Sequence, residues 1–299
     1  MISHLLPRFG MSALLICFAS GIALVFQYQP AGNVFQNMEE ITTLIPFGWL
    51  FRKVHYASGQ LFVIFMLFHT VDHFLRKRYR NYSLKTWALL VIPLGLCFFE
   101  LFTGFILKGD KEGIFAGQIF MNILRDVPLV GLPFSRLLIV PGNDFFILPY
   151  IYHCLFLPAL ILYLIRQHIR PWFEDRKTFL GGVLFFLVYS IIVPQPMDIP
   201  PEADVQTIQS PWFFLGIQTL LKTLNPVLAG IVLPGIFFLC LLFLPLCGKI
   251  SQSNGVIQRL SGKGCRVLHY FVMTAFFLYA LLCLKAAIGF RILDFGFWI

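Results

Sequence analysis

Seven apolar runs divide the sequence, and each is close to the roughly 20 residues that an α-helix needs to cross a bilayer. They lie near residues 11–28, 50–75, 87–107, 147–167, 178–194, 226–247 and 267–289. Only 12% of the 299 residues are charged, about half the share that is usual in a soluble domain. The sequence therefore predicts an all-α membrane protein with about seven transmembrane helices.

Lysine and arginine are concentrated in alternate connections between the runs. Fourteen of the 23 lie before the first run or after the second, fourth and sixth. By the positive-inside rule, the N-terminus is cytoplasmic and the C-terminus is outside. We expect a multi-pass protein of the cell inner (plasma) membrane. The net charge of +9 follows from this topology, so it does not call for a nucleic-acid partner.

Two long connections lie on the predicted outer side. Residues 108–146 contain two short amphipathic stretches that are interrupted at Val127–Pro133, and residues 194–225 are polar and acidic before "SPWFFLGIQTLLKTL". Long ordered loops are usually functional rather than simple spacers. We expect two domains, a four-helix domain at 1–175 and a three-helix domain at 176–299.

Two of the apolar runs carry histidines at matched intervals. His55 and His69 are 14 residues apart, which puts them about 21 Å apart along a helix and about 40° from a common face. His153 and His168 are 15 residues apart and about 60° from a common face. Both helices run inward from the outer side. Packed together, they would form an outer histidine pair (His55 with His153) and an inner histidine pair (His69 with His168).

Each pair could supply the two axial ligands of a haem iron, which predicts two haem b groups, one near each membrane surface. A single histidine on an apolar helix is more often an interhelical hydrogen-bonding residue, and a proton-relaying transporter is a further alternative. Two pairs of similar spacing on parallel helices favour haem. The remaining histidines, His4, His73 and His269, lie near the ends of runs and are expected at the membrane interface. The seven cysteines form no C-x-x-C-H or paired C-x-x-C pattern, so covalent haem attachment, iron–sulfur and zinc sites are not indicated.

The sequence around these histidines resembles the cytochrome b family of quinol:cytochrome c oxidoreductases, with the photosynthetic b subunit and its subunit IV fused in one chain. "FGWLFRKVH" resembles the segment before the first ligand and implies that Arg52 binds a haem propionate. "SGIALVFQYQP" and "FTGFIL" resemble the Thr-Gly stretches of the family, which implies that Gly21 and Gly104 lie at a haem face. "VPLVGLPFSRLL" resembles the loop that covers the outer quinol site. "PWFFLG" stands where the family has Pro-Glu-Trp-Tyr, and this implies binding roles for Ser210, Pro211, Trp212 and Phe213.

The chain departs from the family pattern at several positions. Pro211 stands in place of the glutamate that accepts a quinol proton in relatives, and proline has no ionisable group. We therefore expect proton acceptance by Glu100, an acid inside a predicted span, or by loop acids, above all Glu202 and Asp204, with Asp110 and Glu112 as further candidates. The alternative is that strict two-path oxidation is given up. At the inner haem, Pro7 and Leu90 stand where the family has glycines, and Asp72 stands where relatives commonly have arginine.

The resemblance implies a di-haem cytochrome b subunit of a quinol-oxidising respiratory complex, an oxidoreductase that carries electrons between outer and inner quinone sites. It also implies exchange with the quinone pool, dimer formation, and a protein partner with another redox centre. That partner is a Rieske-type iron–sulfur protein or a multihaem c-type cytochrome. The alternative is a non-bifurcating haem-bearing membrane anchor that links another redox enzyme to the quinone pool.

Overall fold

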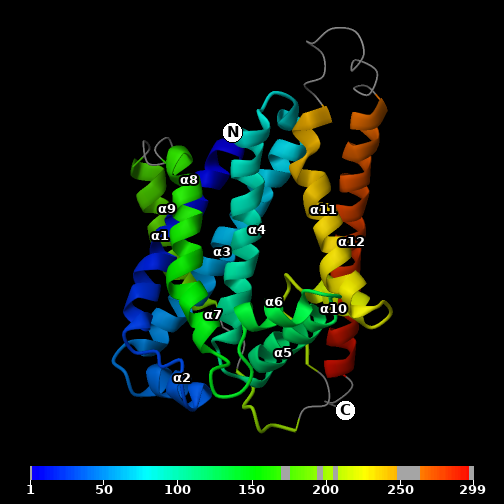
Figure 1. The fold of residues 1–299 in the computed structure, drawn as a ribbon. Coiled ribbons are helices and arrows are strands. Elements are labelled where there is room, and N and C mark those ends of the chain that lie inside the picture. The colour runs from blue at the N-terminus through cyan, green and yellow to red at the C-terminus, as the bar shows by residue number, and fades with distance from the viewer. Residues whose placement is uncertain (1, 170–175, 194–197, 205–207, 248–262, 296–299) are drawn as a thin grey trace. The chain divides into compact units, whose positions relative to one another are not determined.

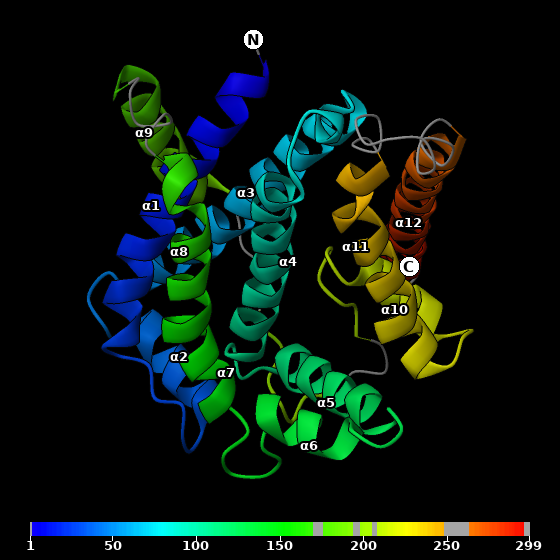
Figure 2. The same cartoon turned by 45° about the horizontal axis from the view of Figure 1, so that its top comes forward.

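The computed structural model describes residues 2–169, 176–193, 198–204, 208–247 and 263–295. Every regular element within these ranges is a helix (Figures 1 and 2), which confirms the predicted all-α class. The longest helices are α1 (Ile2–Val25), α3 (Gly48–Leu75), α4 (Leu84–Ile106) and α12 (Lys263–Phe295). The others are α2 (Val34–Thr43), η1 (Arg78–Arg80), α5 (Lys111–Arg125), α6 (Gly131–Leu138), α7 (Ile147–Ile151), η2 (Tyr152–Phe156), α8 (Leu157–Ile169), α9 (Arg176–Ile192), α10 (Leu215–Leu221), η4 (Leu228–Val232), α11 (Leu233–Leu242) and η5 (Leu244–Cys247).

All seven predicted apolar runs form helices, but they differ in length. Among the described residues, five stretches are long and apolar enough to cross a membrane: Leu5–Val25, Gly48–Leu75, Leu84–Ile106, Ile147–Gln167 and Gly264–Gly289. The other two runs form shorter helices, α9 with 17 residues and the combined stretch Leu228–Leu242. The apolar pattern therefore located the long helices of the described residues. It matched the length of α9 and overestimated the length of the helix at Leu228–Leu242.

A π-helical turn interrupts the helix that carries His153. In η2, the backbone N–H of Leu157 bonds to the carbonyl of Tyr152, five residues earlier. Pro158 explains the irregularity, because it has no N–H and cannot give the preceding turn its usual α-helical hydrogen bond. The turn η4 precedes Pro234 in the same way. Turns of this type are frequent at functional sites.

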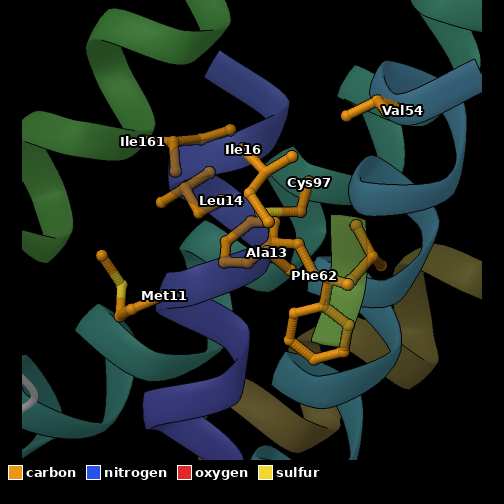
Figure 3. Close-up of a cluster of buried hydrophobic side chains, with 10 residues drawn as sticks. Met11, Ala13, Leu14, Ile16, Val54, Phe62, Cys97 and Ile161 are labelled. Carbon is orange, nitrogen blue, oxygen red and sulfur yellow. The ribbon is translucent and has the colours of Figure 1, made fainter. Parts of the chain in front are cut away.

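The chain divides into two compact units. The first comprises Met1–Lys77, Leu89–Ile114 and Leu137–Ala203. In this unit α1 packs along α3, and α9 contacts both helices (Figure 1). Their backbones approach closely: a Cβ at Gly182 of α9 would lie 2.6 Å from Ser12 Oγ of α1. Small residues at such contacts allow the close van der Waals packing that holds helices together in lipid. The core is shown in Figure 3, and it consists of Met11, Ala13, Leu14, Ile16, Val54, Phe62, Val63, Cys97, Ile161 and Phe186.

The second unit comprises Arg78–Ala88, Phe115–Arg136 and Asp204–Ile299, and within it α12 contacts α10, α11 and η5. Trp87 is fully buried, and its ring N–H donates to the Leu241 carbonyl at 2.8 Å. The Tyr79 hydroxyl lies 3.1 Å from Nδ1 of His269. His269 and, in the first unit, His73 are both buried. The interfacial position expected for these two histidines stays a prediction, because burial by other parts of the protein does not fix their depth in a membrane. The side chain of His4 lies outside the described residues.

The predicted pair of short helices in the 108–146 connection is confirmed by α5 and α6. The Asp110 side chain accepts the backbone N–H of Gly113 at 2.9 Å, which satisfies one of the free N–H groups at the start of α5. Glu112 lies in the first turn of α5 and Arg125 in the last. A negative charge at the N-terminus and a positive charge at the C-terminus both interact favourably with the helix dipole. The break at Val127–Pro133 overlaps the turn between the two helices.

Candidate functional site

The tertiary structure brings His55 of α3 and His153 of η2 together. Their ring centroids are 5.9 Å apart and the ring planes are nearly perpendicular, at 85°. Nδ1 of His55 lies 2.9 Å from the carbonyl oxygen of Cys17, and Nδ1 of His153 lies 3.1 Å from that of Glu100. A carbonyl oxygen can only accept a hydrogen bond, so each Nδ1 carries a proton. Each Nε2 is left with the lone pair that a metal ligand needs.

Two glycines make room for these rings. A Cβ at Gly21 of α1 would lie 2.8 Å from Cε1 of His55, and one at Gly104 of α4 would lie 2.6 Å from Cε1 of His153. Both distances are far below ordinary carbon–carbon contact at about 3.5–4.0 Å. The sequence analysis placed these glycines at a haem face, and in this structure each of them lies against the imidazole itself.

The outer histidine pair fits the two axial positions of a haem iron. Imidazole nitrogens bind metal ions at about 2 Å, so two rings on opposite sides of one ion have centroids about 6 Å apart. The measured separation of 5.9 Å agrees with this geometry. Haem iron already has four porphyrin nitrogens, and a site with two histidines completes its coordination.

The inner histidine pair can be described only in part. His69 of α3 is buried, and its ring centroid is 4.4 Å from that of His73. His168 lies in the last turn of α8, and its side chain is outside the described residues. The pairing of His69 with His168 therefore stays a prediction. His73 was not expected at this position, although its i,i+4 spacing from His69 was a signal that the two rings share a helix face.

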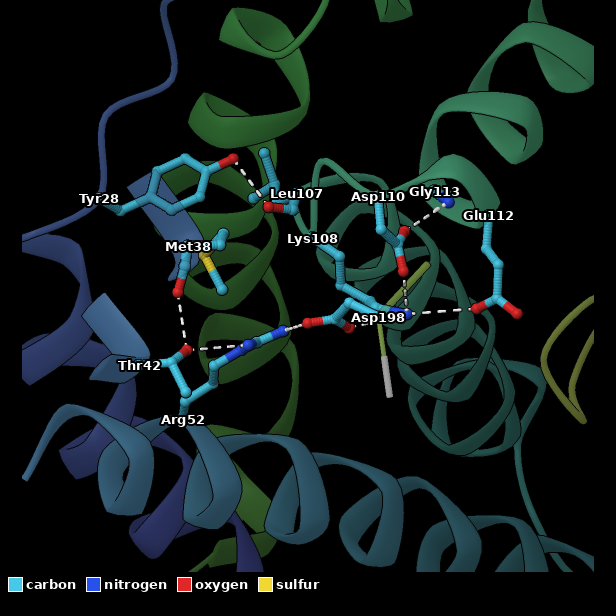
Figure 4. A network of polar contacts seen from close by, with 10 residues as sticks. All are labelled: Tyr28, Met38, Thr42, Arg52, Leu107, Lys108, Asp110, Glu112, Gly113 and Asp198. Carbon is cyan, nitrogen blue, oxygen red and sulfur yellow. Dashed lines mark hydrogen bonds and ion pairs between the residues drawn. The ribbon is translucent and has the colours of Figure 1, made fainter. Parts of the chain in front are cut away.

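Arg52 and Lys108 belong to a partly buried ionic network (Figure 4), in which only the Asp110 side chain is fully buried. The Arg52 guanidinium donates to the Thr42 hydroxyl at 2.9 Å and forms an ion pair with Asp198. Nζ of Lys108 lies 2.6 Å from Asp110 and 3.3 Å from both Glu112 and Asp198. The propionate role expected for Arg52 stays a prediction, and its observed anionic partner is Asp198.

The electrostatics of this network follow from burial and from its own charges. Burial alone would lower the pKa of Lys108, but the adjacent carboxylates, Asp110 first, outweigh it and raise that pKa above its ordinary value. Burial raises the pKa of Glu112, although Lys108 acts in the opposite direction. Lys108 therefore stays a cation and holds three carboxylates together. Sequence analysis missed Asp198, which is 146 residues from Arg52.

The three expected proton acceptors have different environments. Glu100 lies in α4, with Oε1 3.2 Å from Nδ1 of His153. Its second carboxyl oxygen, Oε2, is buried and has no hydrogen-bond partner among the described residues. Glu202 and Asp204 are both exposed. The structure thus brings Glu100 to the outer histidine pair, whereas Glu202 and Asp204 lie at the protein surface.

The Ser210–Phe213 segment lies in the second unit and is fixed by Gln218 and Tyr279. The Gln218 side chain accepts the N–H of Ser210 at 3.0 Å and donates to the Ile208 carbonyl at 2.7 Å. The Tyr279 hydroxyl donates to the Phe213 carbonyl at 3.0 Å. Phe213 is buried and Trp212 is exposed, while the Ser210 hydroxyl oxygen is buried without a hydrogen-bond partner in the described part of the chain. Sequence reasoning missed Gln218 and Tyr279, which do not belong to the quoted segment.

The sequence of this chain is similar to those of known proteins. The family model Cytochrome b/b6/petB matches residues 5–172. Cytochrome b6 of Synechococcus sp. (strain JA-3-3Ab) is 33% identical over 39% of this chain and 55% of its own length. Cytochrome b6 of Desmonostoc sp. (strain PCC 7906) is 30% identical over 46% of this chain and 64% of its own length. The match thus spans between half and two thirds of each b6 relative.

Two further similarities extend over most of the chain. Cytochrome b of Cyanidium caldarium is 24% identical and aligns with 90% of this chain and 80% of its own length. A chain of a solved structure titled "Hyperthermophilic respiratory Complex III" superposes with a TM-score of 0.63 at 18% identity. That superposition covers 94% of this chain and 92% of the other. At this identity the superposition supports a shared fold.

Proposed function

Because the chain belongs to the cytochrome b/b6 family, we propose that it is the di-haem cytochrome b subunit of a quinol-oxidising respiratory complex. The observation that carries this proposal is the approach of the His55 and His153 ring centroids to 5.9 Å, with a glycine against each ring. Residues 1–175 would form the haem-binding domain, and residues 176–299 would correspond to subunit IV.

The outer histidine pair would hold one haem b, and the inner pair would hold the second. The Cys17 and Glu100 carbonyls hold the proton of each outer imidazole on Nδ1, so each Nε2 keeps the lone pair that would bind the iron. When bound, haem supplies reversible one-electron chemistry. Because the two pairs are about 21 Å apart along α3, the chain can carry electrons between an outer and an inner quinone site.

Ser210, Pro211, Trp212 and Phe213 would form the wall of the outer quinol site. The buried Ser210 hydroxyl has unused hydrogen-bonding capacity and can bond a quinol oxygen. Oxidation of one quinol to quinone releases two electrons and two protons, and Pro211 can accept neither proton. We assign proton acceptance to Glu100, Glu202 or Asp204, as acids that replace the missing glutamate.

A protein partner is needed to take electrons on the outer side. The two candidates are a Rieske-type iron–sulfur protein and a multihaem c-type cytochrome. The complex would lie in the cell inner (plasma) membrane, exchange quinone with the lipid pool, and form a dimer. The N-terminus would be cytoplasmic, in agreement with the basic residues of the alternate connections.

Absorbance spectroscopy tests the cofactor assignment. The purified protein should show b-type bands on reduction and two haems per chain, and a reduced spectrum without such bands would end the cytochrome proposal. The quinol site is tested by steady-state quinol oxidation in the assembled complex with single acid substitutions. These are Glu100→Gln, Glu202→Gln, Asp204→Asn, Asp110→Asn and Glu112→Gln. Full activity in all five would make the relocation of proton acceptance wrong, and the non-bifurcating anchor would become the better account.

A further inference from the structure

The two imidazoles of the outer histidine pair have unequal surroundings. Nδ1 of His55 faces the Cys17 carbonyl oxygen at 2.9 Å and the Cys17 sulfur at 3.6 Å. Nδ1 of His153 faces two oxygens of one residue, the Glu100 carbonyl at 3.1 Å and the Glu100 carboxyl Oε1 at 3.2 Å. A carboxyl oxygen is a far stronger acceptor than a thiol sulfur. Only one ligand of the pair therefore has an acidic neighbour.

The local helix geometry produces this contact. Glu100 and Gly104 are four residues apart on α4, so they lie on the same face of the helix, one above the other. Gly104 leaves the space in which the His153 ring lies, and Glu100 is then level with Nδ1. The Thr103 hydroxyl donates to the Glu100 carbonyl at 2.9 Å and lies 3.3 Å from Nδ1 of His153. Contacts from three residues within little more than one turn of α4 thus fix the imidazole against this helix.

A buried acid inside a membrane-spanning helix needs a physical reason, because its desolvation costs several kcal/mol. The carboxyl oxygen Oε1 lies 3.2 Å from Nδ1 of His153, and Oε2 has no hydrogen-bond partner among the described residues. An acid placed beside the proton-bearing nitrogen of a candidate ligand histidine is suited to act on that histidine. An oxygen facing Nδ1–H increases the electron density at Nε2 and fixes the ring orientation.

We propose that Glu100 is a positioning residue that strengthens His153 as a haem ligand. It would make His153 a stronger electron donor to the outer haem than His55. This inference rests on the proposed di-haem function. A stronger donor favours ferric over ferrous iron, so Glu100 lowers the midpoint potential of the outer haem. The inner haem, whose ligands lie on other turns of α3 and α8, keeps its potential independently of Glu100.

The test is a redox titration of both haems in the complete chain, with three variants. Glu100→Leu removes the oxygen and keeps an apolar side chain of similar size, so the outer haem potential should rise. A tenfold change in the reduction equilibrium equals about 59 mV for one electron, and we expect an upward shift of about that size. Glu100→Gln keeps a weaker oxygen acceptor and should give a smaller rise. Glu39→Gln changes an exposed acid of α2 and should leave both potentials unchanged.

The outcomes separate this role from others. A Glu100→Leu protein with unchanged haem potentials and reduced quinol oxidation would overturn the proposal and leave Glu100 as a proton acceptor only. Equal shifts of both haems would also overturn it, because they indicate a general loss of packing. If Glu100→Leu fails to retain the outer haem, the Glu100→Gln protein decides, and an unchanged potential there refutes the inference. Absence of haem in the unmodified protein would instead refute the proposed function itself.

Discussion

Replacement of Gly104 by alanine should remove the outer haem while leaving the inner one. The new Cβ would lie 2.6 Å from Cε1 of His153, about 1 Å inside the normal contact distance. The ring cannot turn away freely, because its Nδ1 is hydrogen-bonded to the Glu100 carbonyl. Overpacking of this kind costs about 1–3 kcal/mol. A ring displaced by about 1 Å also exceeds the roughly 0.2 Å tolerance of a metal–ligand bond.

The assay is haem content per chain from reduced-minus-oxidised absorbance, combined with a redox titration that distinguishes the two haems. A cost of about 1–3 kcal/mol corresponds to roughly fivefold to 150-fold weaker haem binding. The matched control is Gly181→Ala in α9, where a Cβ would meet no atom within 4 Å. That variant should keep both haems, and its helix should gain up to about 1 kcal/mol in propensity. Retention of both haems at unchanged potentials in Gly104→Ala would refute the argument from steric fit.

Three further predictions follow from the same structure. Substitution of His55 or His153 by leucine should in both cases remove the outer haem, and substitution of His69 or His168 should remove the inner haem. If the two substitutions within one pair remove different haems, the pairing is wrong. Lys108→Met should lower the free energy of unfolding by about 3–5 kcal/mol, because it leaves the carboxylates around Lys108 without their cation. The control Arg76→Ala breaks an exposed i,i+4 pair with Asp72 and should lower the free energy of unfolding by about 0.5 kcal/mol or less. Denaturant titration in detergent compares these two variants, and similar losses would contradict the ranking. Single-cysteine labelling should reach the 76–85 loop from the cytoplasm and the 108–146 connection from outside, and the reverse pattern would overturn the topology.

Local patterns in the sequence predicted the features that depend on one helix at a time. The apolar runs predicted the helices, and the α-helical period placed His55 and His69 near one face of α3, because the backbone bonds that set this period join residues four apart. The interruption at Val127–Pro133 likewise separated α5 from α6. Pro158 was visible in the sequence, but the π-turn that it causes was not predicted, although it changes the direction of the side chains around His153.

Contacts between helices could be predicted only where a pattern recurred on both partners. The matched intervals of the histidines predicted that His55 would face His153, and the structure brings these rings within 5.9 Å of each other. No comparable repetition connects Arg52 to Asp198, or Glu100 to His153, and the burial of His73 and His269 depends on which segments cover them.

The sequence by itself therefore determined that this chain is a membrane protein built of helices, with histidines at matched intervals on two of them. Hydropathy and helical period act within a short stretch of chain, so they can be read directly from it. Only the tertiary structure decided that a glutamate stands beside one histidine of the outer pair and a sulfur beside the other. Those neighbours come from α1 and α4, and their positions depend on how closely Gly21 and Gly104 allow the helices to approach the two rings.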